Sequence, residues 1–219
     1  MMVALESWLD KYVATVEAAF GERIWFVGIQ GSYAREEATE TSDIDIVLIL
    51  DVLFPEDIVT YRKLLDTLPH RELICGFFSG REELMTWDTA DLFQFYYDTL
   101  PIRGSLDAII PLLDREAVKR AIKVGAGNIY HGCVHNVLHA KCANTLRNLY
   151  KSAVFTLRAV AFFKTGCYHR RNDELMDYLS DSERKILNHA VSLKNNGTVQ
   201  FEEMSVALFL WSQQVISNF

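Results

Sequence analysis

Several features that mark other classes of protein are missing from this chain. Its four cysteines form no Cys-x-x-Cys pair, and no run of 18 apolar residues occurs, so neither a disulfide framework nor a membrane-spanning helix is expected. The stretch Met1–Phe20 mixes acidic residues with apolar ones at helical spacing. It lacks a basic start followed by an apolar stretch, and therefore predicts a structural helix rather than a signal peptide. Scattered thiols without a leader predict a cytoplasmic protein.

Low-complexity sequence is also missing, because no Pro/Gly/Ser-rich or Gln/Asn-rich stretch interrupts the chain. Of the 219 residues, 50% are hydrophobic and 12% are aromatic. That is enough apolar material for one or two packed domains.

Charge is distributed unevenly. Residues 1–112 contain 20 acidic and 8 basic side chains, whereas residues 113–219 contain 9 acidic and 14 basic ones, within a net charge of −7. This division suggests two modules with different roles, although mutual attraction of the two halves explains it equally well. An acidic chain without a basic-aromatic stripe makes nucleic acid an improbable main partner.

Hydrophobic periodicity predicts an α+β half followed by an all-helical half. In the first half we expect strands at Arg23–Gln30, Asp43–Leu50 and Glu72–Phe78, helices at Pro55–Leu68, Arg81–Trp87 and Thr89–Thr99, and a turn or short strand at Pro101–Ser105. In the second half we expect helices at Asp114–His139, Ala140–Lys164, Asp173–Leu179, Ser182–Leu193 and Phe201–Ser217. The predicted domains are residues 1–110, with a mixed sheet and helices, and residues 111–219, an all-α bundle.

The most informative stretch runs from Gly31 to Asp45. A predicted strand ends at Gly31-Ser32, where glycine permits a tight turn and a close approach of a ligand to the backbone. A helix that begins there would offer free N–H groups to an anion. The next predicted strand begins with Asp43-Ile44-Asp45, and side chains two apart on a strand share one face. The two carboxylates therefore project together, while Ile44 points into the core.

Two carboxylates this close repel each other unless a cation lies between them. Oxygen-only ligands favour Mg²⁺ or Mn²⁺. A phosphate cradle beside such a pair predicts a nucleoside triphosphate held with a divalent metal. The chemistry that suits this arrangement is in-line attack at phosphorus.

This segment resembles the signature of the DNA polymerase β-like nucleotidyltransferase superfamily. The matching positions are Gly31, Ser32, Ala34, Arg35, Ala38, Ser42, Asp43 and Asp45. One departure is Glu36, where many members have glycine. The resemblance implies a nucleotidyltransferase fold and a two-metal mechanism, in which Gly31, Ser32, Arg35 and Ser42 contact the nucleotide and Asp43 and Asp45 hold the metals.

The family usually has a third carboxylate on a later strand. Glu72 is the only acid in the predicted strand Glu72–Phe78 and is our candidate, with solvation of the strand edge as the alternative. An acid of the helical half, such as Glu116, is a second candidate for the base.

The order of the two halves resembles kanamycin- and lincosamide-type nucleotidyltransferases, whose helical domain is similar to the HEPN group. The stretch 149–166 has the look of that group's central helix. Basic residues there and at the start of the helical half, above all Lys151 but also Arg158, could contact the triphosphate; the alternative is a solvated helix face. The RNase-type Arg–His motif of HEPN proteins is not evident.

Two further groups have ordinary explanations beside functional ones. His131, His135 and His139 are spaced by four residues and could line a polar cleft or, less readily, bind a metal, but packing or exposure accounts for them as well. Phe93, Phe95, Tyr96 and Tyr97 could stack on an acceptor, although core packing is the commoner role for such a group.

The combined prediction is an enzyme that moves a nucleoside monophosphate, AMP from Mg·ATP in the first instance, to a hydroxyl of an acceptor, with release of pyrophosphate. The expected acceptor is a small molecule, such as an aminoglycoside- or lincosamide-like compound, bound between the two domains. The alternatives are a fused regulatory or protein-modifying (AMPylating) unit and a non-catalytic nucleotide-binding protein. A homodimer is compatible with all three.

Overall fold

The computed structural model describes residues 3–40, 42–195 and 197–219. The chain divides into two compact units. The first comprises Met1–Asp88 and Phe95–Pro111, and the second comprises Thr89–Gln94 and Leu112–Phe219.

The first unit is built on a four-stranded mixed sheet with the strand order β3-β2-β1-β4. Strand β1 (Ile24–Ile29) pairs antiparallel with β2 (Ile44–Leu50) and with β4 (Leu100–Arg103), and β2 pairs parallel with β3 (Ile74–Gly80). The helices of this part are α1 (Leu5–Phe20), α2 (Gly31–Ala34), α3 (Pro55–Leu65) and α4 (Arg81–Met85), with 3₁₀ turns at Gly21–Arg23, Arg71–Leu73 and Asp107–Leu112. Helix α5 (Thr89–Asp98) is divided between the units, because residues 89–94 belong to the second and residues 95–98 to the first. The parallel pair needs a crossover connection, and α3 lies within it.

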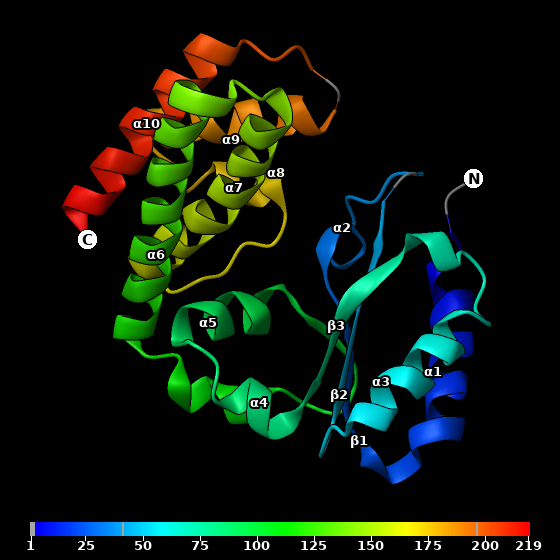
Figure 1. Ribbon diagram of the computed structural model, residues 1–219. Coiled ribbons are helices and arrows are strands. Elements are labelled where there is room, and N and C mark those ends of the chain that lie inside the picture. Colours follow the sequence, from blue (N-terminus) through cyan, green and yellow to red (C-terminus); the bar gives the residue numbers. More distant parts are fainter. Residues whose placement is uncertain (1–2, 41, 196) are drawn as a thin grey trace. The chain divides into compact units, whose positions relative to one another are not determined.

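Alternation along β2 separates the two faces of the sheet. Ile44, Ile46, Leu48 and Leu50 are fully or almost fully buried in a core that they share with α1 and α3, the two helices that cover this face in Figure 1. The residues between them, including Asp45, point to the opposite face because side chains on a strand alternate. The sequence therefore places one carboxylate of the pair on the face away from the main core.

Ring contacts show that neighbouring side chains of β3 point to opposite faces of the sheet. Phe78 contacts Tyr61 of α3, with ring centroids 4.4 Å apart. Phe77 contacts Trp87 and Phe95 instead, at 4.7 and 5.1 Å.

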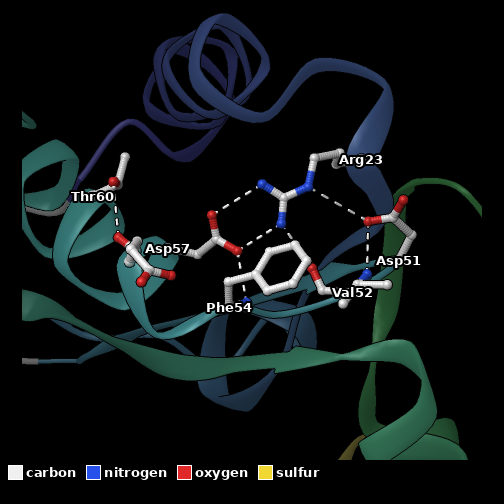
Figure 2. A network of polar contacts seen from close by, with 7 residues as sticks. Arg23, Asp51, Val52, Phe54, Asp57 and Thr60 are labelled. Carbon is white, nitrogen blue, oxygen red and sulfur yellow. Dashed lines mark hydrogen bonds and ion pairs between the residues drawn. The ribbon is translucent and has the colours of Figure 1, made fainter.

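One end of the sheet is held by a network of charges and hydrogen bonds (Figure 2). Arg23, just before β1, donates from Nη2 to Asp57 Oδ2 (2.6 Å) and to the carbonyl of Val52 (2.8 Å). Asp57 also accepts from the backbone N–H of Phe54, which caps α3, and the Arg23 guanidinium lies 5.2 Å from the centre of the Phe54 ring. The hydrogen bond from Arg23 holds the pKa of Asp57 below its usual value.

The second unit is helical: α6 (Arg115–His135), α7 (Ala143–Thr165), α8 (Asn172–Met176), α9 (Asp181–Lys194) and α10 (Phe201–Asn218). Helices α6 and α7 pack on each other, α6 also packs on α10, and α7 packs on α9. Tyr150 is fully buried among them, and its hydroxyl group has hydrogen-bond partners. The hydroxyl lies 3.0 Å from His189 Nδ1 and donates to the carbonyl of Met204 at 2.9 Å. None of the helices in the described ranges combines the length and apolar character that crossing a bilayer requires.

Several predicted boundaries are wrong by a few residues. The third strand begins at Ile74 rather than at Glu72, and α3 ends at Leu65 rather than at Leu68. The predicted junction of two helices at residues 139–140 is a π-helical turn, Asn136–Ala140, after which α7 begins at Ala143. The buried Asn136 side chain stabilises this turn by bonding both the N–H and the carbonyl of Cys142.

Candidate functional site

The candidate site begins where β1 ends. Gly31 follows directly with φ +69°, a conformation that glycine adopts without strain. Gln30 anchors the turn on both sides: its backbone N–H donates to the carbonyl of Asp45 (2.8 Å), and its side-chain amide donates to Thr99 Oγ1 (2.6 Å). The turn is therefore attached both to the strand that carries Asp45 and to the chain just before β4.

Asp45 lies directly against this turn. A Cβ atom built on Gly31 would collide with Oδ2 of Asp45. Glycine at position 31 thus serves twice, because it permits the left-handed backbone and leaves room for the carboxylate. The motif brings Asp45 and the Gly31-Ser32 turn together as the sequence predicted.

The second carboxylate of the pair precedes the strand. Asp43 is exposed and Asp45 is partly buried, whereas Ile44 between them is fully buried in the core behind. An exposed and a partly buried carboxylate can both coordinate a divalent cation whose remaining ligands are water or phosphate oxygens, so this donor set fits Mg²⁺ or Mn²⁺.

The loop between α2 and β2 is held by its own side chains. Ser42 Oγ accepts from the N–H of Thr39 at 2.8 Å, so its first role is to shape the loop. Arg35 ends α2 and pairs with Glu37, with Nε and Oε2 3.6 Å apart. Glu36, the departure from the superfamily pattern, has φ +58°. This position requires a left-handed conformation, which gives a physical reason for glycine there in other members.

The structure does not bring Glu72 into β3. Glu72 is exposed and lies in the 3₁₀ turn Arg71–Leu73 that precedes the strand. The residue that pairs with Asp45 across the parallel ladder is Cys75, which is also exposed. Sequence reasoning missed Cys75 because its position beside Asp45 depends on where β3 begins.

In the second unit, the two basic candidates on α7 differ sharply. Lys151 is exposed, whereas Arg158 is only 2% exposed. Arg158 Nη2 donates to Asn172 Oδ1 at 3.0 Å, its Nε has no hydrogen-bond partner, and no ion pair to it occurs in the ranges that the structure describes. A buried guanidinium without a carboxylate is costly, but at 2% exposure Arg158 is not accessible to a ligand, so Lys151 is the accessible candidate of the two.

The three histidines and Glu116, the remaining candidates, lie in the second unit. His131, His135 and His139 are exposed, with neighbouring ring centroids 6.3 and 4.9 Å apart. No three His, Cys, Asp or Glu side chains in the described part of the chain are grouped so that they could hold a metal. Glu116 is exposed in the first turn of α6.

The aromatic group around α5 is mostly a packing feature. Phe93 and Phe95 are buried. Tyr96 and Tyr97 are half-buried and contact each other edge to face, with ring centroids 5.0 Å apart.

Comparison with known proteins agrees with this geometry. The nucleotidyltransferase domain family matches residues 12–123. No match was found among curated protein sequences.

One solved structure has a similar fold over nearly the whole chain: spectinomycin adenyltransferase AAD(9) from Enterococcus faecialis, in complex with ATP and spectinomycin. The two proteins share 12% identity and align with a TM-score of 0.62 over 96% of this chain and 98% of the other. The family match spans half of the chain and contains both the Gly31-Ser32 turn and the two aspartates. The protein therefore belongs to the nucleotidyltransferase domain family.

Proposed function

We propose that this nucleotidyltransferase moves AMP from Mg·ATP to a hydroxyl group of a small-molecule acceptor. The acceptor oxygen forms a bond to the α-phosphorus, the bond between that phosphorus and the bridging oxygen breaks, and pyrophosphate leaves while the hydroxyl loses its proton. The observation that carries the proposal is the position of the Asp45 carboxylate against the Gly31-Ser32 turn. It puts a candidate metal ligand and a candidate phosphate contact side by side.

Asp43 and Asp45 would hold the divalent ion, and Gly31 and Ser32 would face the phosphates. The ion, when bound, supplies positive charge that offsets the charge of the phosphate oxygens. Arg35 and Ser42 support this site mainly by shaping the loop, as their contacts to Glu37 and Thr39 indicate. In the second unit, the exposed Lys151 is the candidate for a phosphate contact, whereas Arg158 is buried.

The acceptor is proposed to be cationic. Residues 1–112 carry 20 acidic and 8 basic side chains, and a field of that sign attracts a positively charged ligand. The protein of similar fold was solved with spectinomycin as well as ATP. Spectinomycin and related amino-sugar compounds are therefore the first acceptors to test.

The test uses calorimetry followed by an assay of pyrophosphate release. We expect the wild-type protein to bind Mg·ATP and the Asp45→Asn variant to bind it about 100-fold more weakly, a loss of about 2.7 kcal/mol. Asp10→Asn, the same change at an exposed site on α1, is the matched control and keeps wild-type affinity. Equal affinities in the three proteins, or no binding of any nucleoside triphosphate at millimolar concentration, would contradict the proposal.

A second candidate is a protein that binds nucleotide without transferring it. One observation favours it: Asp45 is the only acid in the four described strands, so the sheet supplies no further carboxylate as a general base. Binding of Mg·ATP without pyrophosphate release for any acceptor in the panel would select this candidate. Pyrophosphate release that depends on one acceptor would remove it.

A further inference from the structure

The parallel ladder of β2 and β3 places Cys75 next to Asp45. Asp45 pairs with Cys75, and Val47 pairs with Phe77. Neighbouring strands are about 4.8 Å apart, and paired residues direct their side chains to the same face. Phe77 contacts Trp87 and Phe95, while Phe78 contacts Tyr61 of α3 on the face of the main core. Cys75, two residues before Phe77, therefore shares the face of Asp45.

In the described residues, β3 supplies no carboxylate beside Asp45. The sequence of β3, Ile-Cys-Gly-Phe-Phe-Ser-Gly, contains no acid. Glu72 lies three positions before Cys75 in a 3₁₀ turn and is exposed.

Two carboxylates are too few to retain a hard divalent ion on their own. Mg²⁺ takes six oxygen ligands and is usually bound by one or two carboxylates together with substrate phosphates and water. A third carboxylate at position 75 would add a negative charge and an oxygen ligand, whereas the ladder places a cysteine there.

We propose that Cys75 occupies the position of an absent third metal-binding carboxylate, so that the site retains its divalent ion only jointly with the phosphates of the nucleotide. The proposal rests on the assignment of Asp43 and Asp45 as metal ligands in the proposed function. In such a site ion and nucleotide each strengthen binding of the other, and by linkage the factor is the same in both directions.

The first measurement is a titration of the full-length protein with Mn²⁺, followed by electron paramagnetic resonance of the free ion, with and without ADP. We expect the wild type to bind Mn²⁺ at least about tenfold more tightly with saturating ADP than without it, after correction for Mn²⁺·ADP in solution, equivalent to about 1.4 kcal/mol. Equally tight binding of Mn²⁺ in the absence of nucleotide would overturn the proposal, because the protein would then hold a complete ligand set.

The second measurement installs the carboxylate. Cys75→Asp is expected to bind Mn²⁺ alone about tenfold more tightly than Cys75→Asn, which has the same shape without the charge. Cys167→Asp makes the same change at another exposed cysteine, in the second unit, and is expected to leave Mn²⁺ affinity unchanged. Indistinguishable affinities for Cys75→Asp and Cys75→Asn would show that position 75 does not face the ion.

Two further variants separate the possible failures. Glu72→Gln is expected to leave Mn²⁺ binding unchanged. A clear loss of Mn²⁺ affinity would identify Glu72 as the third ligand and overturn the proposal. This test remains valid even if the Cys75→Asp variant does not fold. Combining Cys75→Asp with Asp45→Asn is expected to abolish the gain. If the wild type binds neither Mg·ATP nor ADP, the proposed function fails, whereas the comparison of the two Cys75 variants with Mn²⁺ alone still decides the role of position 75.

Discussion

The two ends of the sheet in the first unit serve different purposes. At the end where β1 begins and β2 stops, Arg23 joins Asp51, Asp57 and the Phe54 ring in a network of opposite charges (Figure 2). At the other end, residues 35–45 contain five acids and one arginine, and a glycine replaces side-chain bulk next to Asp45. The first end is arranged for stability. The second concentrates acidic charge on a short loop, which is costly for the fold and useful for binding a cation.

Gly31→Ala should produce the largest loss of stability and nucleotide affinity at the end of the sheet that carries the loop of residues 35–45. The new Cβ would combine left-handed strain of about 1–2 kcal/mol with a collision against Asp45, which would displace the carboxylate. We expect a loss of about 3 kcal/mol in the free energy of unfolding and no measurable Mg·ATP binding. Gly166→Ala is the matched control, because Gly166 has φ +75° in the left-handed region and nothing within 4 Å. It should show the strain alone, with unchanged affinity, in urea unfolding and calorimetry.

Arg23→Met should disrupt the charge network at the opposite end of the sheet. The change removes hydrogen bonds to a carboxylate whose side chain is only 10% exposed, so we expect a loss of about 2 kcal/mol in unfolding free energy. Arg71→Met removes an ion pair of exposed side chains, Arg71–Asp66, and should cost less than about 0.5 kcal/mol. Neither variant should change Mg·ATP affinity. A large loss of affinity in Arg23→Met would show that the two ends are coupled.

Gln30→Met tests whether the turn must be held in place. Methionine keeps the length of the side chain but loses the hydrogen bond to Thr99, so we expect Mg·ATP affinity to fall about tenfold, or about 1.4 kcal/mol, with little change in melting temperature. Thr99→Val, which removes the acceptor, should match it, and Thr99→Ser should restore wild-type affinity. Wild-type affinity in both Gln30→Met and Thr99→Val would show that the hydrogen bond between Gln30 and Thr99 does not contribute to nucleotide binding.

Glu36→Gly should have the smallest effect. Glycine relieves left-handed strain of about 1–2 kcal/mol but loses part of that gain to the more flexible unfolded chain, which leaves a stabilisation of about 0.5 kcal/mol. His70→Gly, at φ +60° and outside the motif, should show a similar gain in unfolding experiments. Destabilisation by Glu36→Gly alone would mean that contacts of the Glu36 side chain outweigh its backbone strain.

Local patterns in the sequence were sufficient for much of this unit. Strands β1 and β2 lie within the ranges that alternation and β-branched residues predict. The short segment Leu100–Arg103 is a strand, one of the two predicted alternatives, because it pairs with β1. The predictions failed where a single side chain sets the boundary, as Asn136 does by bonding Cys142 across the π-helical turn. Periodicity carries no information about such a clamp.

The site shows the same limit. The spacing of Asp43 and Asp45 and the glycine at position 31 follow from residues adjacent in the sequence, and the structure places Asp45 against Gly31 as expected. The assignment of Glu72 to a strand was wrong, because the chain forms a 3₁₀ turn before β3. The sequence favoured Lys151 over Arg158 on the same helix, but it did not indicate that Lys151 is exposed and that Arg158 is buried.

The sequence alone thus determined the superfamily, the Gly31-Ser32 turn and the carboxylate pair, because short-range geometry of the backbone controls each of them. Tertiary structure decided that Cys75 stands beside Asp45. That neighbour depends on the register between β2 and β3, two strands separated by a whole helical crossover. A shift of one residue in the register would turn the opposite face of β3 toward the site, and only packing of the strands and helices around them selects one register.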